Sequence, residues 1–196
     1  MMRLGIIVAH TQAAKGSKGV RPLDMHEYDF NKELAIDIWR EAKDRGIDCQ
    51  VFTFDNLTWP LIGNKVNEWC GKSGVCIELH CNTFNGKVTG TETLFDNSPD
   101  QSKTFARHIH DHICSALSRK PKENKGIRLV HEVDEVHFEW KSRGFNVRSI
   151  TVPCCIVQPV FWDNHQESSL LWRERNRYVK SLIVGTLDYF AKTRVE

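Results

Sequence analysis

Three side chains in this sequence have the chemical types and the positions of a metal site. His10 directly follows the apolar run at residues 4–9, and His80 ends the run at residues 75–80. Glu27 follows the loop that begins after His10. Two imidazoles and one carboxylate, with a fourth position left to water, are a common ligand set of hydrolytic zinc sites. Zinc lowers the pKa of its bound water to about 7 and polarises a scissile carbonyl group.

Strand ends explain how residues so far apart in the sequence could meet. Three apolar runs are typical of strands buried on both faces, and each ends at a polar side chain, namely His10, His80 or Gln158. In open α/β sheets, ligands bind beyond the carboxyl ends of the strands. Glu27, at the start of a predicted helix, could place its carboxylate beside both histidines. A histidine at a strand end also fits a structural, hydrogen-bonded role, and spacing alone leaves both interpretations open.

The pattern of the whole chain supplies the elements that would hold these residues. Continuous or alternating apolar segments predict strands, and apolar residues on one helical face predict helices. Because strands alternate with helices, we expect an α/β fold, a single three-layer sandwich with a mostly parallel or mixed central sheet flanked by helices. The predicted strands are residues 4–9, 48–54, 75–80, 91–95 and 150–157; the predicted helices are residues 27–45, about 61–69, 102–117 and 167–191; residues 120–126 are predicted as an exposed turn.

The composition is that of one globular domain spanning residues 1–196. Hydrophobic residues make up 40% and charged residues 27% of the chain, as in proteins with a substantial core. The net charge is +2 and no basic run occurs, so we expect no nucleic-acid partner. No segment approaches the roughly 18 apolar residues of a membrane helix, and no secretory signal is evident. We therefore expect a monomer that is made in the cytoplasm without a signal peptide and does not insert into membranes.

Most of the other residues that could take part in chemistry are interpreted as structural. The seven cysteines are odd in number and contain no CxxC pair, which predicts buried reduced thiols. His108, His110 and His112 are interpreted as a solvated polar face of a helix. Trp162 follows the strand that ends at Gln158 and is the better aromatic candidate for lining a cleft. Residues 131–140 would form either a loop at the rim of the cleft or an exposed hairpin.

Four short motifs, in this order and spacing, resemble one family of enzymes. They are the strand followed by histidine at residues 4–10, EYDFN at 27–31, ELHCNTFNG at 78–86 with GTETLF at 90–95, and VPCCIVQPVFWDN at 152–164. Together they resemble the type 3 N-acetylmuramoyl-L-alanine amidases, a family that includes phage endolysins. Those enzymes cut the amide between the lactyl group of muramic acid and the L-alanine of the stem peptide. The resemblance covers nearly the whole chain.

The resemblance implies an activity, a cofactor and a set of site residues. It implies a zinc-dependent amidase catalytic domain that acts on peptidoglycan or muropeptides and, like an endolysin, lyses the cell wall after release. The family's zinc ligands fall on His10, Glu27 and His80, with one zinc ion per chain. Substrate-binding positions fall on two further residues, Asn82 and Glu92. The family's general base, a glutamate, falls on Gln158.

Gln158 is the departure from the family pattern. A carboxylate can take a proton from zinc-bound water and return it to the leaving amine, whereas a neutral amide cannot. Loss of a general base typically costs about 10²–10⁴-fold in rate, so we expect an inactive or slow enzyme. Either position 158 was changed deliberately, or the natural protein lost its base or moved it to Glu78 or Glu92. Glu78 also fits a buried ion pair or a hydrogen-bonded acid.

Two other functions stay open at this point. With Gln158, the same fold could be a zinc-containing module that binds muropeptides without cutting them. It could also be a different zinc amidohydrolase that acts on a small acyl-amino acid.

Overall fold

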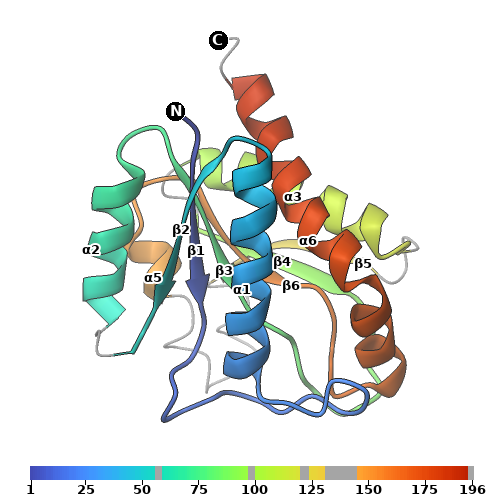
Figure 1. The fold of residues 1–196 in the computed structure, drawn as a ribbon. Coiled ribbons are helices and arrows are strands. Elements are labelled where there is room, and N and C mark those ends of the chain that lie inside the picture. Colours follow the sequence, from blue (N-terminus) through green and yellow to red (C-terminus); the bar gives the residue numbers. More distant parts are fainter. Residues whose placement is uncertain (56–58, 97–99, 120–123, 131–144, 194–196) are drawn as a thin grey trace.

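The computed structural model describes residues 1–55, 59–96, 100–119, 124–130 and 145–193. Within them, strands and helices alternate along most of the chain, as predicted (Figure 1). In chain order the elements are β1 (Arg3–Val8), α1 (Glu27–Asp44), β2 (Asp48–Thr53), α2 (Trp59–Cys70), β3 (Val75–Leu79), β4 (Thr91–Phe95), α3 (Gln101–Ala116), β5 (Asn124–Leu129), α5 (Phe145–Ser149), β6 (Cys154–Gln158) and α6 (His165–Thr193).

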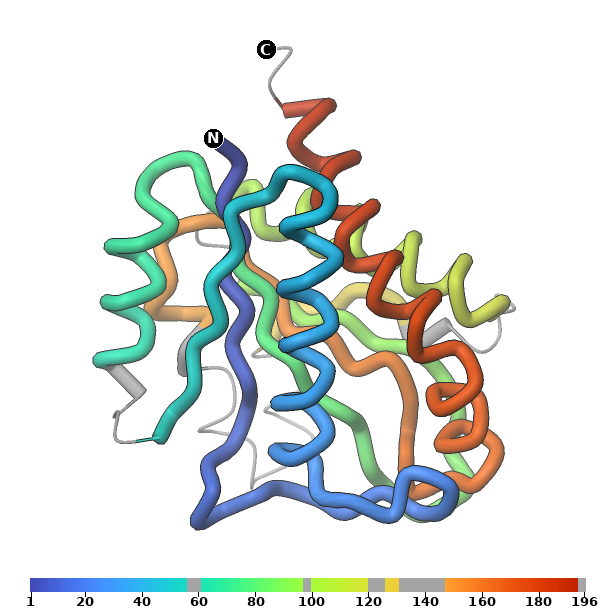
Figure 2. The backbone as a smooth tube through the Cα atoms, in the orientation of Figure 1, coloured from blue at the N-terminus to red at the C-terminus, as the bar shows by residue number. Residues whose placement is uncertain are grey.

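The strands form one mixed sheet in the order β2-β1-β3-β6-β4-β5. The pairs β2–β1, β1–β3, β3–β6 and β4–β5 are parallel, and only the β6–β4 pair is antiparallel among these neighbours. The carboxyl ends of β1, β3 and β6 therefore lie at one edge of the sheet. Figure 2 shows the connection from β1 to α1 passing along this edge before it returns to the helix.

Helices cover both faces of the sheet and complete a three-layer sandwich (Figure 1). One core cluster joins α1, α3 and α6 to one face, and a second joins α2 and α5 to the other. In β3 the side chains alternate between the two clusters: Val75, Ile77 and Leu79 belong to the first and Cys76 to the second. The central strands are buried on both faces for this reason, which explains their continuous apolar runs.

Helix α1 begins at the candidate ligand Glu27 and is held down by an apolar face. Phe30, Leu34, Ile38 and Ala42 recur every four residues and are all buried, as the helical period requires. Acidic residues in the first turn interact favourably with the positive end of the helix dipole. The helix ends before the segment in which Gly46 adopts φ +73°, a conformation that glycine tolerates best.

The structure differs from the sequence prediction around β5 and β6. Residues 120–126 were expected to form a turn, yet β5 begins at Asn124, where it pairs with β4 as an edge strand. An edge strand does not need the apolar run by which the central strands were identified. The strand predicted at residues 150–157 begins only at Cys154, as β6. Ile150 and Val152 are apolar because they are buried in the second core cluster, although they are not part of the strand. Helix α5 was not predicted.

Two further observations concern the rest of the chain. All seven cysteines are free thiols; six of them are buried, as predicted, whereas Cys114 is partly exposed. Among the described helices, none combines the length and apolar character needed to cross a bilayer.

Candidate metal centre and active site

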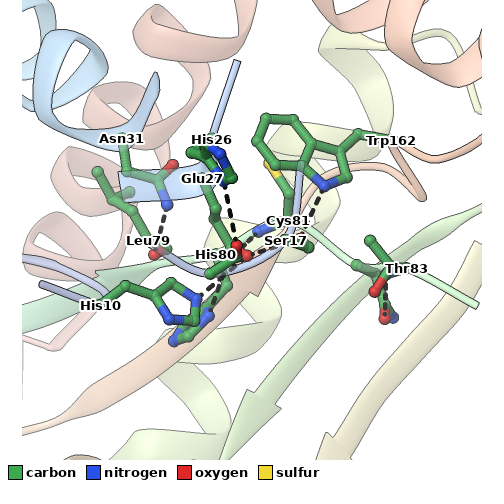
Figure 3. Close-up of polar contacts among 12 residues, drawn as sticks. His10, Ser17, His26, Glu27, Asn31, Leu79, His80, Cys81, Thr83 and Trp162 are labelled. Carbon is green, nitrogen blue, oxygen red and sulfur yellow. Dashed lines mark hydrogen bonds and ion pairs between the residues drawn. The ribbon is translucent and has the colours of Figure 1, made fainter. Parts of the chain in front are cut away.

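His10, Glu27 and His80 converge at the carboxyl edge of the sheet (Figure 3). Nε2 of His10 lies 3.1 Å from Oε2 of Glu27, and Nδ1 of His80 lies 3.0 Å from Oε1 of the same carboxylate. One candidate ligand atom from each residue lies within 4.8 Å of the other two. In the part of the chain that the structure describes, this is the only group of three such residues. The geometry therefore brings together the three ligands predicted from the sequence.

Each of the three residues is positioned by a different element. His10 follows β1 with φ +68°, a left-handed conformation that turns the chain out of the strand. His80 follows β3, and its backbone N–H donates to the Val157 carbonyl, which extends the β3–β6 pairing to the site. Glu27 is the first residue of α1, and one turn later Asn31 donates from Nδ2 to the Leu79 carbonyl. That bond ties the helix to the end of the strand that carries His80.

The Glu27 carboxylate is buried and held by both of its oxygens. The Ser17 hydroxyl donates to Oε2 at 2.9 Å, and the Cys81 backbone N–H donates to Oε1 at 2.9 Å. Burial by itself would raise the pKa of Glu27, but its contacts with His10 and His80 outweigh burial and hold that pKa well below its usual range. Glu27 is thus an ionised carboxylate between two imidazoles.

His80 is also buried and lies between two carboxylates. Its Nδ1 faces Glu27, and its Nε2 lies 3.1 Å from Oε1 of Glu78. Burial lowers the pKa of His80, but hydrogen bonds to Glu27 and Glu78 outweigh burial and raise it to about 9. Glu27 and Glu78 therefore favour a positive charge at His80 when no metal is bound. The same negative surroundings would attract a metal cation.

The buried Nε2 atom of His10 gives a second indication of a cation site. It lies close to Glu27 but makes no aligned hydrogen bond to any described residue. A buried nitrogen without such a bond normally costs free energy, and coordination to a metal would remove that cost. Two imidazoles and one carboxylate are also the donor set that a catalytic zinc ion takes, with one position open. The residues therefore fit zinc.

The loop between β1 and α1 shapes the site through residues that the sequence pattern does not reveal. A Cβ atom on Gly16, which has φ +74°, would lie 2.5 Å from Nε2 of His10. Ser17 accepts a hydrogen bond from Nε1 of Trp162 while it donates to Glu27. Trp162 is fully buried and packs against Phe30, so the prediction that it lines a cleft is wrong. Instead, Trp162 supports the loop between β1 and α1 through its hydrogen bond to Ser17.

Gln158, Glu92 and Asn82 form a second polar group beside the first. Gln158 and Glu92 are paired across β6 and β4, and Nδ2 of Asn82 lies 3.1 Å from Oε2 of Glu92 and 3.4 Å from Oε1 of Gln158. Arg128, from the unpredicted strand β5, contacts the other Glu92 oxygen at 3.1 Å. Nε2 of Gln158 is buried and has no hydrogen-bond partner among the described residues. The amide therefore has a buried donor without a partner in this part of the structure.

The three histidines of α3 do not form a uniform solvated face. His110 is buried and its Nδ1 lies 3.0 Å from the Thr93 hydroxyl, because this side of α3 packs against β4. His108 and His112 both face Asp188 of α6, at 2.9 and 3.5 Å. The interpretation was wrong for His110. The segment at residues 131–140 lies outside the described residues.

Comparison with known proteins places this arrangement in a family. Residues 4–186 match the family described as N-acetylmuramoyl-L-alanine amidase. A curated relative, an uncharacterized cell wall amidase of Bacillus anthracis, is 24% identical over 131 residues, which are 61% of this chain. The match spans only 22% of that relative's length.

Solved structures show the same fold. The catalytic domain of CwlV, an N-acetylmuramoyl-L-alanine amidase from Bacillus (Paenibacillus) polymyxa var. colistinus, superposes with a TM-score of 0.77 at 19% identity, covering 96% of this chain and 98% of that one. The catalytic domain of the CD27L endolysin targeting Clostridia difficile gives 0.74 at 22% identity, with the same coverage. With a family match over almost its entire length, this chain belongs to the N-acetylmuramoyl-L-alanine amidase family.

Proposed function

We propose that this chain is a zinc-dependent amidase that hydrolyses the bond between N-acetylmuramic acid and L-alanine in peptidoglycan. The convergence of His10, Glu27 and His80 on one point carries the proposal, together with the family match. When bound, zinc would supply an activated water and would polarise the scissile carbonyl. Because all three ligands come from one chain, we propose that the monomer is sufficient. The likeness to an endolysin catalytic domain supports action on the cell wall after release.

The remaining polar residues of the site would handle substrate. Asn82 and Glu92 form a fixed pair next to position 158, and Arg128 holds Glu92 in place from the other side. Such a pair, buried and hydrogen-bonded, can orient the polar groups of a muropeptide without rearranging. We therefore assign Asn82 and Glu92 to substrate binding.

Position 158 is where the general base belongs in our proposal, and its amide limits turnover. Gln158 can accept a hydrogen bond at Oε1 and donate one from Nε2, so it can orient a water molecule or a substrate carbonyl. It cannot remove a proton. The two alternative acids are already engaged: Glu92 contacts Asn82 and Arg128, and Glu78 contacts His80. We propose a slow enzyme whose rate is limited at this position.

Gln158 carries an amide instead of a carboxylate, and its Nε2 donor has no partner among the described residues. Both features also favour a second candidate function, a zinc-containing module that binds muropeptides without cutting them. Both candidates require the metal group and differ in whether a carboxylate at position 158 restores cleavage. The slow amidase and the binding module would share the rest of the site, so only the response to a general base at position 158 distinguishes them.

One experiment separates the two candidates. The native chain, Gln158→Glu and the control Gln50→Glu, which makes the same change on the exposed edge strand β2, are incubated with purified peptidoglycan, and new L-alanine amines are counted. We expect Gln158→Glu to release them about 10²–10⁴-fold faster than the other two. Equal rates for all three would reject the role of position 158. Binding without product by Gln158→Glu would establish the binding module.

A further inference from the structure

Glu78 is a buried acid that the proposed reaction does not use. It lies on β3 two residues before His80, so strand alternation directs both side chains to the same face of the sheet. Its carboxylate is fully buried, and Oε1 lies 3.1 Å from Nε2 of His80. A buried carboxylate costs considerable free energy unless it is paired and hydrogen-bonded. The contact with His80 offsets part of this cost and links Glu78 to the candidate metal site.

The two nitrogens of the His80 ring face different partners. Nδ1 lies 3.0 Å from the carboxylate of Glu27, whose other oxygen lies 3.1 Å from His10. Nε2 faces Glu78 on another side of the ring. Nδ1 is the nitrogen that faces Glu27, and Nε2 is already paired with Glu78, so Nδ1 is the nitrogen available to a metal ion that Glu27 also holds. The structure thus separates a metal-facing nitrogen from a carboxylate-facing nitrogen.

We infer that Glu78 is a positioning residue that holds His80 in the tautomer with hydrogen on Nε2, so that the lone pair of Nδ1 faces the metal. This inference rests on the proposed function. In a neutral imidazole one nitrogen donates and the other accepts, so an N–H directed at Glu78 leaves Nδ1 as the ligand. Metal-bound histidines commonly donate their second N–H to a carboxylate, which fixes the ring and increases its basicity.

The inference also agrees with the contacts that surround the ring. The backbone N–H of His80 is bound to Val157, both ring nitrogens have carboxylate partners, and the side chain is only 6% exposed. Removal of Glu78 would leave an N–H without its acceptor and would allow the ring to turn. The affinity for zinc would fall although no ligand was removed.

The test measures zinc affinity by competition with a chelator for the native chain, Glu78→Ala and Glu78→Gln. Outer carboxylates of this kind are typically worth about 10–100-fold in metal affinity, so we expect a loss of that size for Glu78→Ala. Glu78→Gln keeps an oxygen that can accept the N–H and should recover part of the loss. The matched control is Glu167→Gln, which alters another buried carboxylate, paired with Arg119, and should leave zinc affinity unchanged.

A second readout tests the tautomer directly. Long-range ¹H–¹⁵N spectra of the zinc-loaded native chain should show zinc on Nδ1 and hydrogen on Nε2 of His80. Coordination through Nε2, or a Glu78→Ala variant that is folded and binds zinc as tightly as the native chain, would overturn the inference and leave the metal site intact. A native chain that takes up no zinc would instead refute the proposed function.

Discussion

Gly16 lies so close to His10 that a single methyl group at position 16 would collide with the imidazole. A Cβ atom there would be 2.5 Å from Nε2, the atom that faces Glu27. The backbone also has φ +74°, which a side chain disfavours. Position 16 therefore requires glycine for two reasons, its backbone conformation and its closeness to His10. Only the second reason concerns the candidate metal site.

Gly16→Ala should weaken zinc binding by at least about tenfold, comparable with the loss of a supporting residue around a metal. The reason is that the methyl group displaces the His10 ring. Gly46→Ala is the matched control, because Gly46 has φ +73° and a Cβ atom at that position would have no other atom within 4 Å. Both variants should lose a similar small amount of thermal stability. Equal zinc affinities in the two variants would contradict the expected displacement of His10 and count against its assignment as a ligand.

Ser17→Ala tests the support of Glu27. The hydroxyl donates to Oε2 of Glu27 and accepts from Nε1 of the buried Trp162, so its removal leaves the indole N–H without an acceptor. We expect a loss of about 1–3 kcal/mol in the free energy of unfolding and about tenfold weaker zinc binding. Chemical denaturation and chelator competition measure the two effects.

Ser102→Ala separates the two effects. Ser102 is more deeply buried than the half-buried Ser17, and its hydroxyl accepts a hydrogen bond from the Cys154 backbone N–H. It lies on α3, which carries none of the three candidate metal ligands. This variant should lose stability and keep its zinc affinity. If Ser17→Ala behaved in the same way, the hydrogen bond to Glu27 would have no role in metal binding.

The pH dependence of stability reports on His80 in the metal-free protein. The pKa of His80 in the folded chain is about 9, above the unfolded value of 6.5, so its contribution to stability is fully present below pH 6.5 and is lost as the pH rises to about 9. The melting temperature of the metal-free native chain should therefore fall across this range. His80→Gln should remove most of this fall, whereas His165→Gln, at an exposed position, should keep it. A flat profile for the native chain would contradict the charged state assigned to His80.

The convergence of His10, Glu27 and His80 could be predicted because their positions follow from regular elements, whereas their role as zinc ligands was indicated by the resemblance to a family. His10 and His80 come directly after apolar runs, and parallel strands bring their carboxyl ends to the same edge of the sheet. Glu27 begins a helix whose apolar period is unambiguous. The antiparallel register of β4 and β6 places Glu92 and Gln158 opposite each other, which strand alternation alone does not determine.

Residues on irregular or edge segments could not be predicted in this way. Gly16 and Ser17 lie in a loop whose path has no period, and only the folded chain shows that they contact His10 and Glu27. Arg128 lies on the edge strand β5, whose polar sequence resembles a turn. Trp162 was assigned to a cleft from its position after β6, but burial of its large apolar ring against Phe30 prevailed.

The most direct test of the metal centre is the zinc content of purified, dialysed protein, measured by elemental analysis for the native chain, His80→Ala and the control His108→Ala. His108 faces Asp188, on helices away from the metal group. We predict about one zinc ion per chain for the native protein and for His108→Ala, and almost none for His80→Ala. A folded His80→Ala protein that retains one zinc ion per chain, or a native chain that binds none, would contradict the assignment of His10, Glu27 and His80 as one metal centre.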